Sequence, residues 1–327
     1  MTDAWSDLAA SLASVEAELV PKAPDAATAA EVHPYLARLL TTALHDGFLT
    51  HEDTGHGLKR LWPRFGGPYH DYRMWQGPLE AGQSYRFTAT LNDVERLGVG
   101  TYKRTPSGVT LLEDYVVFQS EQVDLTVGHA GQLRTSPETQ HIMVRELLRP
   151  PGTRAADMRL TLADGTALPP PPAHCDLARS AGWVVAIARN FARWSELMAE
   201  RPNELTLPPE ELAAAYLGDA GTHYFPGYYD LAEDEVLVVE RPALPCYTWS
   251  LSTYTHWLEP LPHPFTATAL TDNLRLGLPA DAAATFRLSP TAGNGATIIT
   301  GRRRGAMLFR TIGAEEVVVP RARVERR

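Results

Sequence analysis

The sequence predicts a mainly β protein with helical additions: two antiparallel domains of the β-sandwich or jelly-roll type, joined by a helical linker. Short segments rich in β-branched and aromatic residues alternate with turns rich in Gly, Pro and Ser. The intervals between these segments are too short for crossover helices, so neighbouring strands are expected to pair antiparallel. The chain has 327 residues, which is long for one ordinary domain and fits two.

Helical periodicity at two places divides the chain. We expect N-terminal helices in residues 1–60, a first β domain in 61–168, a proline-rich boundary and helical linker in 169–220, and a second β domain in 221–327. Four consecutive prolines at 169–172 mark the boundary, because such a run is stiff and extended.

The N-terminal region predicts two amphipathic helices. In residues 3–20, apolar side chains recur at steps of three and four, Asp3 can cap the start, and Pro21 ends the helix. The stripe consists of Trp5, Leu8, Leu12, Val15 and Leu19. A second helix with its own stripe is expected at 27–45. Both stripes need cover, so we expect these helices to dock on the rest of the protein.

Strands and linker helices follow in order. The first β domain is expected to hold strands at 84–91, 99–104, 108–118, 123–128, 141–148 and 157–164. A helix is expected at 174–199, and a second, short one from Pro208 to about 217, since proline suits a first helical turn. From 221 onward the pattern is strand-rich again.

Charge excludes some partners. The chain carries 39 acidic and 30 basic residues, so no general attraction to nucleic acid or to an anionic membrane is expected. The acidic excess lies in residues 1–53, whereas the C-terminal part is rich in arginine: Arg302, Arg303, Arg304, Arg310, Arg321, Arg323, Arg326 and Arg327. The two ends are expected to attract one another, within one chain or between the subunits of a homo-oligomer.

Other features predict a soluble cytoplasmic protein without an organic cofactor. The N-terminus has no positive region followed by an unbroken apolar run, and no long apolar stretch occurs elsewhere. The two cysteines, Cys175 and Cys246, lie in a helix-like and a strand-like segment and form no CxxC pattern, and we do not expect a disulfide between them. Phosphate-binding loops, a dinucleotide fingerprint and a GxSxG elbow are all absent from the sequence.

The segment His45–His56 raises the question of a metal site. It reads HDGFLTHEDTGH, but three residues separate Glu52 from His56, not the two of an HExxH motif. Glycines also break the helix that would align the imidazoles. We therefore expect a solvated loop and no metal.

The most aromatic stretch, Gly221–Leu261, supplies the main candidate site. Side chains alternate along the strand expected at 247–254, which leaves one face apolar and the other polar. The polar face leads into His256 and is either the wall of a small-molecule pocket or a solvated outer surface. The residues of this face and its continuation are Thr248, Ser250, Ser252, Tyr254, His256, Trp257 and Glu259.

If this is a working site, three residues share the chemistry. His256 is the proton shuttle, Glu259 its orienter or a second acid/base, and Tyr254 a hydroxyl donor. The alternative makes Trp249 and Trp257 core residues and His256 an exposed strand end.

A second candidate group occupies Gly66–Trp75, which reads GGPYHDYRMW. Its glycines and proline predict a turn from which polar and aromatic side chains project. His70 and Asp71 form an acid/base pair if the turn brings them together. In the alternative, Asp71 bonds the backbone of the turn and the aromatic rings pack.

Three segments carry a family resemblance. The run WSLSTYTHWLEPL resembles the WSxxxYxxWxxxL signature of the bacterial proteins assigned to domain-of-unknown-function 1214, and GYYDLAEDEVLVVER and GGPYHDYRMWQGPLEAGQSYRF resemble two other segments of the same proteins. The likeness covers about residues 66–312. It implies a fold and almost no chemistry.

Three arginines of this chain can be compared with the corresponding positions of the related proteins. Arg86 and Arg145 fall where related proteins have basic residues, and each is either a paired structural cation or an anchor for a carboxylate or sulfate. In NGATIITGRRRGAMLFRTI, Arg302 stands where relatives have a histidine. The arginines of this turn either clamp an anionic substrate, lie in a solvated hairpin, or meet the acidic N-terminal helices.

These features predict an enzyme that needs no organic cofactor and modifies a small molecule by acid/base chemistry of the lyase, isomerase or cyclase type, in a cleft between the two β domains, in a biosynthetic setting. A non-catalytic binding or scaffold protein is the alternative. The predicted substrate-binding residues are Trp75, Arg86, Arg145, His223, Tyr224, Tyr228, Trp249, Trp257 and Arg302.

Overall fold

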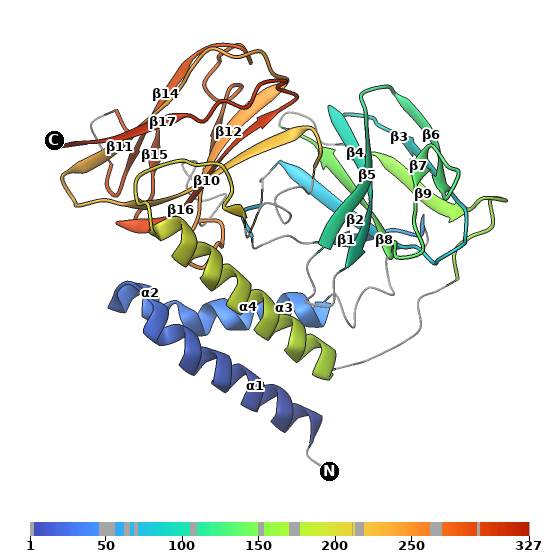
Figure 1. Ribbon diagram of the computed structural model, residues 1–327, viewed down its shortest axis with the longest axis horizontal. Coiled ribbons are helices and arrows are strands. Elements are labelled where there is room, and N and C mark those ends of the chain that lie inside the picture. Colours follow the sequence, from blue (N-terminus) through green and yellow to red (C-terminus); the bar gives the residue numbers. More distant parts are fainter. Residues whose placement is uncertain are drawn as a thin grey trace.

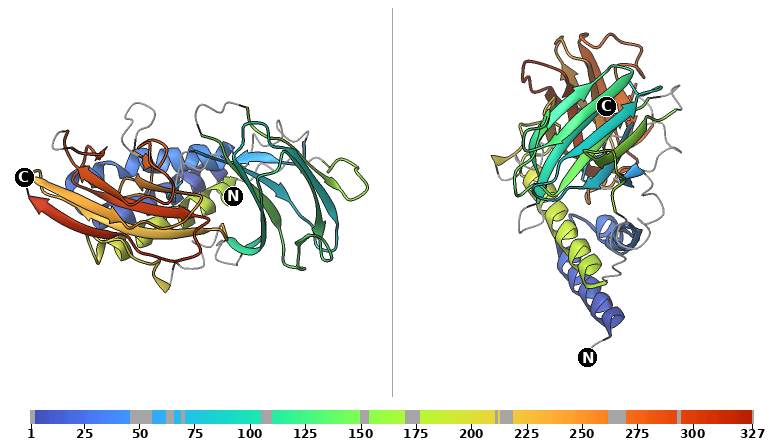
Figure 2. Two further views of the ribbon diagram at one scale, coloured as in Figure 1. Left: turned by 90° about the horizontal axis from the view of Figure 1, so that it is seen from above. Right: turned by 90° about the vertical axis from the view of Figure 1, so that its right-hand side faces the viewer.

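The protein consists of two β halves that lie side by side, with helices packed beneath them, mainly against the second half (Figures 1 and 2). This computed structural model describes residues 3–45, 56–61, 66–68, 71–104, 110–149, 154–169, 177–210, 212, 219–261, 270–292 and 295–326. Four sheets, antiparallel except for two short parallel pairs, form two sandwich-like halves. The predicted fold class is confirmed.

The first half contains a five-stranded sheet of order β1-β2-β8-β4-β5 and a four-stranded sheet of order β7-β6-β3-β9. Its strands are β1 (Lys59–Leu61), β2 (Tyr72–Pro78), β3 (Tyr85–Thr90), β4 (Arg96–Arg104), β5 (Thr110–Phe118), β6 (Gln122–Gly128), β7 (Leu133–Arg134), β8 (His141–Leu147) and β9 (Asp157–Leu162). Side chains such as Phe87, Val99 and Val144 alternate inward from both sheets and form one apolar core.

The second half is built in the same way from sheets of order β10-β16-β12-β13 and β15-β14-β11-β17. Its strands are β10 (Thr222–Asp230), β11 (Glu235–Arg241), β12 (Thr248–Thr253), β13 (Leu270–Asp272), β14 (Ala284–Ser289), β15 (Ile298–Ile299), β16 (Arg304–Ile312) and β17 (Arg321–Arg326). Trp249, Phe286 and Phe309 pack ring against ring at the centre of its core.

The helices are α1 (Ala4–Leu19), η1 (Val20–Lys22), α2 (Ala26–Ala30), α3 (Val32–Leu44) and α4 (Leu177–Ala199). Apolar residues of α1 and α3 pack on α4 and on Trp257, which buries the predicted stripes. Two details differ from the prediction. Trp5 is 60 % exposed, and the helix expected at 27–45 is divided at Glu31, because Pro34 lacks the N–H that would continue the ladder to Ala30.

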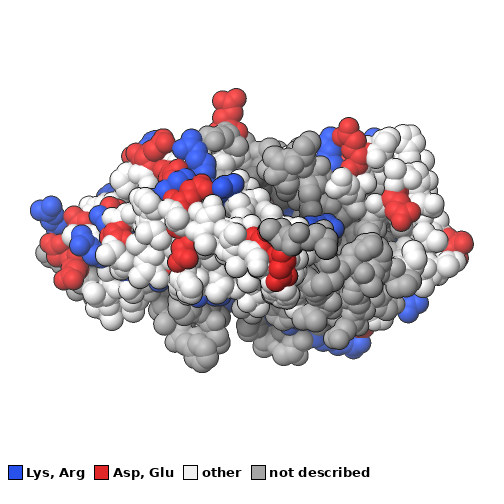
Figure 3. Space-filling view, turned by 90° about the horizontal axis from the view of Figure 1, so that it is seen from below, with Lys and Arg blue, Asp and Glu red and all other residues white. Residues whose placement is uncertain are grey.

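Ion pairs add to this docking. Arg302 pairs with Glu31 at 2.7 Å and Arg304 with Asp25 at 3.2 Å. The acidic and basic ends of the chain thus meet, and of the two predicted alternatives they do so within one molecule. On the face shown in Figure 3, acidic and basic side chains are interspersed. No helix among the described residues combines the length and the apolar character needed to span a membrane.

Some sequence predictions of local structure were wrong or fall outside the description. Tyr72–Pro78 was assigned in part to a turn but forms β2, which pairs along its whole length with β8. The solvated reading of β12 is wrong, because both faces of this strand are buried. Most of the short helix expected after Pro208, and most of the His45–His56 segment, lie outside the described residues.

Candidate functional site

The candidate site lies where the two β halves face one another. On β4, Leu97 and Val99 point into the core of the first half, so the alternate residues point outward. The same alternation holds on β8, where Ile142 and Val144 point inward. The outer face of the five-stranded sheet therefore carries Tyr72, Arg96, Tyr102, Tyr115 and Arg145.

A buried ion pair joins the two β halves at this interface. Arg96 donates two hydrogen bonds, of 2.8 and 3.0 Å, to Asp219, which lies just before β10, and a third of 3.0 Å to the Tyr72 hydroxyl. Burial on its own would raise the pKa of Asp219, but the hydrogen bonds and charge of Arg96 hold this pKa below its ordinary value. Asp219 is therefore ionised and fully engaged by Arg96.

Arg145 is the second buried cation of the interface and is only 7 % exposed. Its guanidinium donates a hydrogen bond to the Tyr102 hydroxyl and lies 5.3 Å from the centre of that ring. No carboxylate among the described residues contacts it. The charge of Asp219 acts on Arg145, yet both oxygens of Asp219 are bonded to Arg96.

Two glycines of β4 make room for the tyrosines. A Cβ atom at Gly98 would lie 1.8 Å from the Tyr115 hydroxyl, and one at Gly100 would lie 2.8 Å from the Tyr102 ring. The Tyr115 hydroxyl is buried and has no hydrogen-bond partner in the described part of the chain. Burial raises the pKa of Tyr115 well above its ordinary value, so this hydroxyl is protonated at neutral pH.

The opposing wall is the outer face of the sheet that contains β10, β12 and β16. Arg310 is buried there, donates to Ser252 at 3.3 Å and to the Tyr254 hydroxyl at 3.1 Å, and lies 5.8 Å from the centre of the Tyr224 ring. Burial raises the pKa of Tyr224 to about 12, while the charges of Arg145 and Arg310 act to lower it. Tyr224 thus lies within electrostatic reach of both arginines.

Two more hydroxyls on this wall lack partners. The side-chain oxygens of Thr222 and Ser250 are buried and make no hydrogen bond within the described residues. Both belong to the face opposite the core residues Phe225 and Leu251. Together with Tyr115, they place unsatisfied hydroxyls on both walls of the interface.

Of the predicted site residues, Arg145 and Tyr224 lie in this interface, and Tyr254 lies at its edge, where its hydroxyl donates to Pro68 O at 2.8 Å. Asp71 binds Arg275 through two hydrogen bonds of 2.8 and 2.9 Å, which ties the first half to the second. His70 is outside the described residues, so its pairing with Asp71 stays a prediction.

The predicted group Tyr254, His256 and Glu259 is divided among different environments. His256 is 4 % exposed rather than an exposed strand end, and its Nδ1 lies 2.8 Å from the Tyr228 hydroxyl. Burial lowers the pKa of His256 to about 4. Glu259 instead accepts two hydrogen bonds from Arg38, so Tyr228 and not Glu259 orients the imidazole.

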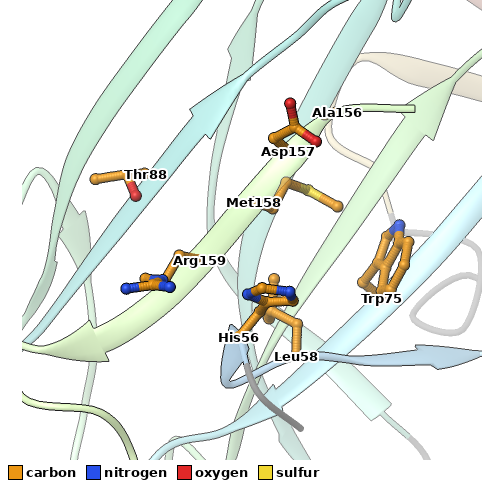
Figure 4. A pocket seen from close by; sticks show the side chains of 8 residues that line it. All are labelled: His56, Leu58, Trp75, Thr88, Ala156, Asp157, Met158 and Arg159. Atoms are coloured by element: carbon orange, nitrogen blue, oxygen red, sulfur yellow. The ribbon is translucent and has the colours of Figure 1, made fainter. Parts of the chain in front are cut away.

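Trp75 lines a separate pocket of about 580 Å³ within the first half. Figure 4 shows its neighbours there, which are His56, Leu58, Thr88, Ala156, Asp157, Met158 and Arg159. The Trp75 indole N–H donates to the buried carboxylate of Glu146, whose other oxygen accepts from the Ala156 amide at 2.8 Å. This pocket is not part of the interface site.

The remaining predicted residues have structural contacts elsewhere. Trp249 belongs to the core of the second half, and Trp257 stacks on Tyr35 at 5.8 Å and donates to Thr28 O. The other contacts are His223 with Ala314 O at 2.9 Å, Arg86 with Asp124 on an exposed surface, Arg302 with Glu31, and Tyr228 with His256.

Sequence reasoning missed Arg96, Tyr102, Tyr115 and Asp219. The alternation of Arg96, Gly98, Gly100 and Tyr102 along one strand was a usable signal, because glycines beside large polar side chains indicate a close approach. No comparable signal marks Asp219. Among the described residues, no group of three or more His, Cys, Asp and Glu side chains is arranged to hold a metal ion.

Comparisons with known proteins show the fold and no activity. No protein-family model matches the chain, and no curated protein matches it. The chain is similar to an uncharacterized protein from Burkholderia cenocepacia of known structure, with 24% sequence identity and a TM-score of 0.84 over 99% of this chain and 96% of that chain. It is also similar to a protein from Vibrio parahaemolyticus, with 11% identity and a TM-score of 0.52 over 89% of this chain and 100% of that chain. The resemblance found in the sequence is thus supported as a fold shared with uncharacterized bacterial proteins.

Proposed function

We propose that the protein binds a small molecule in the interface between its two β halves. The observation that carries this proposal is the set of buried hydroxyls of Tyr115, Thr222 and Ser250, which come from both walls and make no hydrogen bond among the described residues. Leaving such a group unsatisfied costs about 1–3 kcal/mol. A polar ligand, or water in its absence, supplies the missing partners.

Acid/base turnover of that molecule is the second candidate function. Burial raises the pKa of Tyr72, Tyr102 and Tyr115, so all three hydroxyls are donors at neutral pH. A buried phenol beside a guanidinium is suited to protonate or stabilise an oxyanion as it develops. This arrangement fits the lyase, isomerase or cyclase chemistry expected from the sequence, with tyrosines taking the roles first assigned to His256 and Glu259.

The family assignment is also a proposal. The segments that resemble domain-of-unknown-function 1214 include β10, β11, β12 and β2, which are central to the two halves. The structural likeness to the Burkholderia cenocepacia protein over almost the whole of both chains supports common descent. Neither observation adds an activity.

Binding is tested by screening small metabolites for thermal stabilisation of the protein. A molecule bound at the interface should stabilise the unaltered protein and lose this effect in Ser250→Leu, whose side chain occupies the polar wall. Arg86→Ala is the control, because Arg86 is exposed and far from the interface by its contacts. Equal stabilisation of all three proteins by every compound would contradict the proposed site.

Turnover is tested with a substrate found in that screen. Tyr115→Phe removes the unsatisfied hydroxyl and should lower kcat by about 100-fold if Tyr115 acts as the acid. Glu259→Gln is the matched control, since Glu259 is engaged by Arg38. A loss of kcat in Glu259→Gln with none in Tyr115→Phe would return the chemistry to the His256 segment.

A further inference from the structure

We propose that the molecule bound in the interface is a small carboxylate, held by Arg145 and Tyr115. This inference rests on the proposed function, because it specifies the chemical class of the ligand at that same site. It is carried by the charge of Arg145 on β8, which has no carboxylate partner among the described residues, and by the Tyr115 hydroxyl on β5, which has no hydrogen-bond partner among them; β4 lies between these two strands.

The charge of Arg145 has no carboxylate partner among the described residues, unlike the charges of three other arginines near the interface. Arg96 is paired with Asp219, Arg149 with Glu95, and Arg275 with Asp71 and Asp272. Arg145 is as buried as Arg96, yet its one hydrogen bond among the described residues goes to a neutral tyrosine. A buried guanidinium without an anion is costly, so its retention indicates an anion that binds there.

The register of the sheet brings a second donor to the same place. Arg145 on β8 pairs with Gly98 on β4, and the Tyr115 hydroxyl lies over Gly98. Directly paired residues have Cβ positions about 5 Å apart. The Tyr115 hydroxyl, which reaches from β5 across β4 to the Cβ position of Gly98, therefore lies close to the point from which the Arg145 side chain starts. The charge of Arg145 also acts on Tyr115, opposing the effect of burial on its pKa.

The chemistry of these groups selects a carboxylate. A planar guanidinium and a neighbouring hydroxyl can donate to the two oxygens of one carboxylate. Arg145 offers one positive charge that no carboxylate of the described residues balances, together with neutral hydroxyls, which matches a single negative charge. A phosphate would bring a larger charge, and sites for phosphate commonly add a helix N-terminus or several cations.

Two buried arginines on the same sheet face provide a matched test that needs no ligand. Arg145→Met replaces an unpaired cation by an apolar side chain, so the melting temperature should stay equal or rise by about 2–4 °C. Arg96→Met leaves Asp219 buried without a cation, so the melting temperature should fall by several degrees. A fall in Arg145→Met as large as that in Arg96→Met would overturn the claim that Arg145 is unpaired.

Ligand class is tested by calorimetry with acetate, benzoate and phenylacetate, each compared with its primary amide at constant ionic strength. At least one carboxylate should bind more tightly than its amide, and this preference should fall by about 10- to 100-fold in both Arg145→Met and Tyr115→Phe. Carboxylates and amides that bind equally, or a preference that survives in Arg145→Met, would overturn the assignment while leaving the proposed function intact. Absence of binding by all six probes and by every compound of the metabolite screen would instead remove the proposed function itself.

Discussion

Arg38 of α3 holds Glu259 through two hydrogen bonds of 2.5 and 2.6 Å, joining residues 221 positions apart in the chain. Glu259 is buried, whereas Arg38 is partly exposed. The carboxylate lies in the turn that follows β12, so this pair attaches the N-terminal helices to the second β half. Arg302 with Glu31 and Arg304 with Asp25 attach the same helices at other points.

The pair of Arg38 and Glu259 should stabilise the folded protein. Arg38→Met leaves the buried Glu259 carboxylate without its cation, so the free energy of unfolding should fall by about 1–2 kcal/mol. Arg86→Met is the matched control, since it removes an equally bidentate pair with Asp124 on an exposed surface and should change stability by less than about 0.5 kcal/mol. Urea denaturation measures both, and equal losses would show that burial of Glu259 has no energetic role.

Removing the N-terminal helices tests their part in the core. Deletion of residues 1–46 exposes the faces of α4 and Trp257 that α1 and α3 cover. The shortened protein should melt at a lower temperature or aggregate, because a large apolar surface becomes exposed. A melting curve unchanged from that of the full chain would mean that the helices are dispensable.

His256 should make stability depend on pH. Burial lowers its pKa to about 4, compared with about 6.5 for an unfolded chain. The unfolded state therefore binds the proton first, and the stability due to neutral His256 is complete above pH 6.5 and is lost as the pH falls from 6.5 to 4. Its full size is about 3 kcal/mol.

A comparison with a variant that lacks the imidazole separates the pH dependence due to His256 from that due to carboxylates, which titrate over a similar pH range. Unfolding is measured at pH 7 and pH 5 for the natural protein and for His256→Gln, which keeps a polar side chain beside Tyr228 but cannot titrate. The natural protein should lose about 2 kcal/mol more than the variant between these pH values. The same loss in both proteins would show that His256 is not neutral and buried.

Gly98 and Tyr115 should be coupled. Gly98→Ala places a methyl group on the Tyr115 hydroxyl and should cost about 1–3 kcal/mol, and Tyr115→Ala in the same chain should remove most of this cost. Gly182→Ala is the control. It lies in the interior of α4 with open space around it, so alanine should stabilise the protein by about 0.5–1 kcal/mol. Additive effects of the Gly98 and Tyr115 changes in a double-mutant cycle would contradict the contact.

Local sequence patterns were sufficient for most elements of the fold. Alternating apolar residues predicted the strands at 84–91 and 141–148, and steps of three and four predicted the helix at 3–20, because these periods follow directly from strand and helix geometry. The strand Tyr72–Pro78 was missed, since glycines and a proline precede it and its own pattern is weak. Its pairing with β8 joins residues distant in sequence, which no local pattern encodes.

The candidate site, too, was predictable from the sequence only in part. The sequence singled out Arg145 as an arginine of an expected strand and Tyr224 as part of an aromatic stretch, and by itself it could go no further than paired cation or anion anchor for Arg145. What covers each face was decided only by the packing of one half on the other, which brings Asp219 to Arg96 and leaves Arg145 without a carboxylate among the described residues. Likewise, Tyr254, His256 and Glu259 are close in sequence but bind partners from three distant segments. Side-chain direction is a local property of the backbone, whereas the partner of a buried charge depends on contacts between segments far apart in the chain.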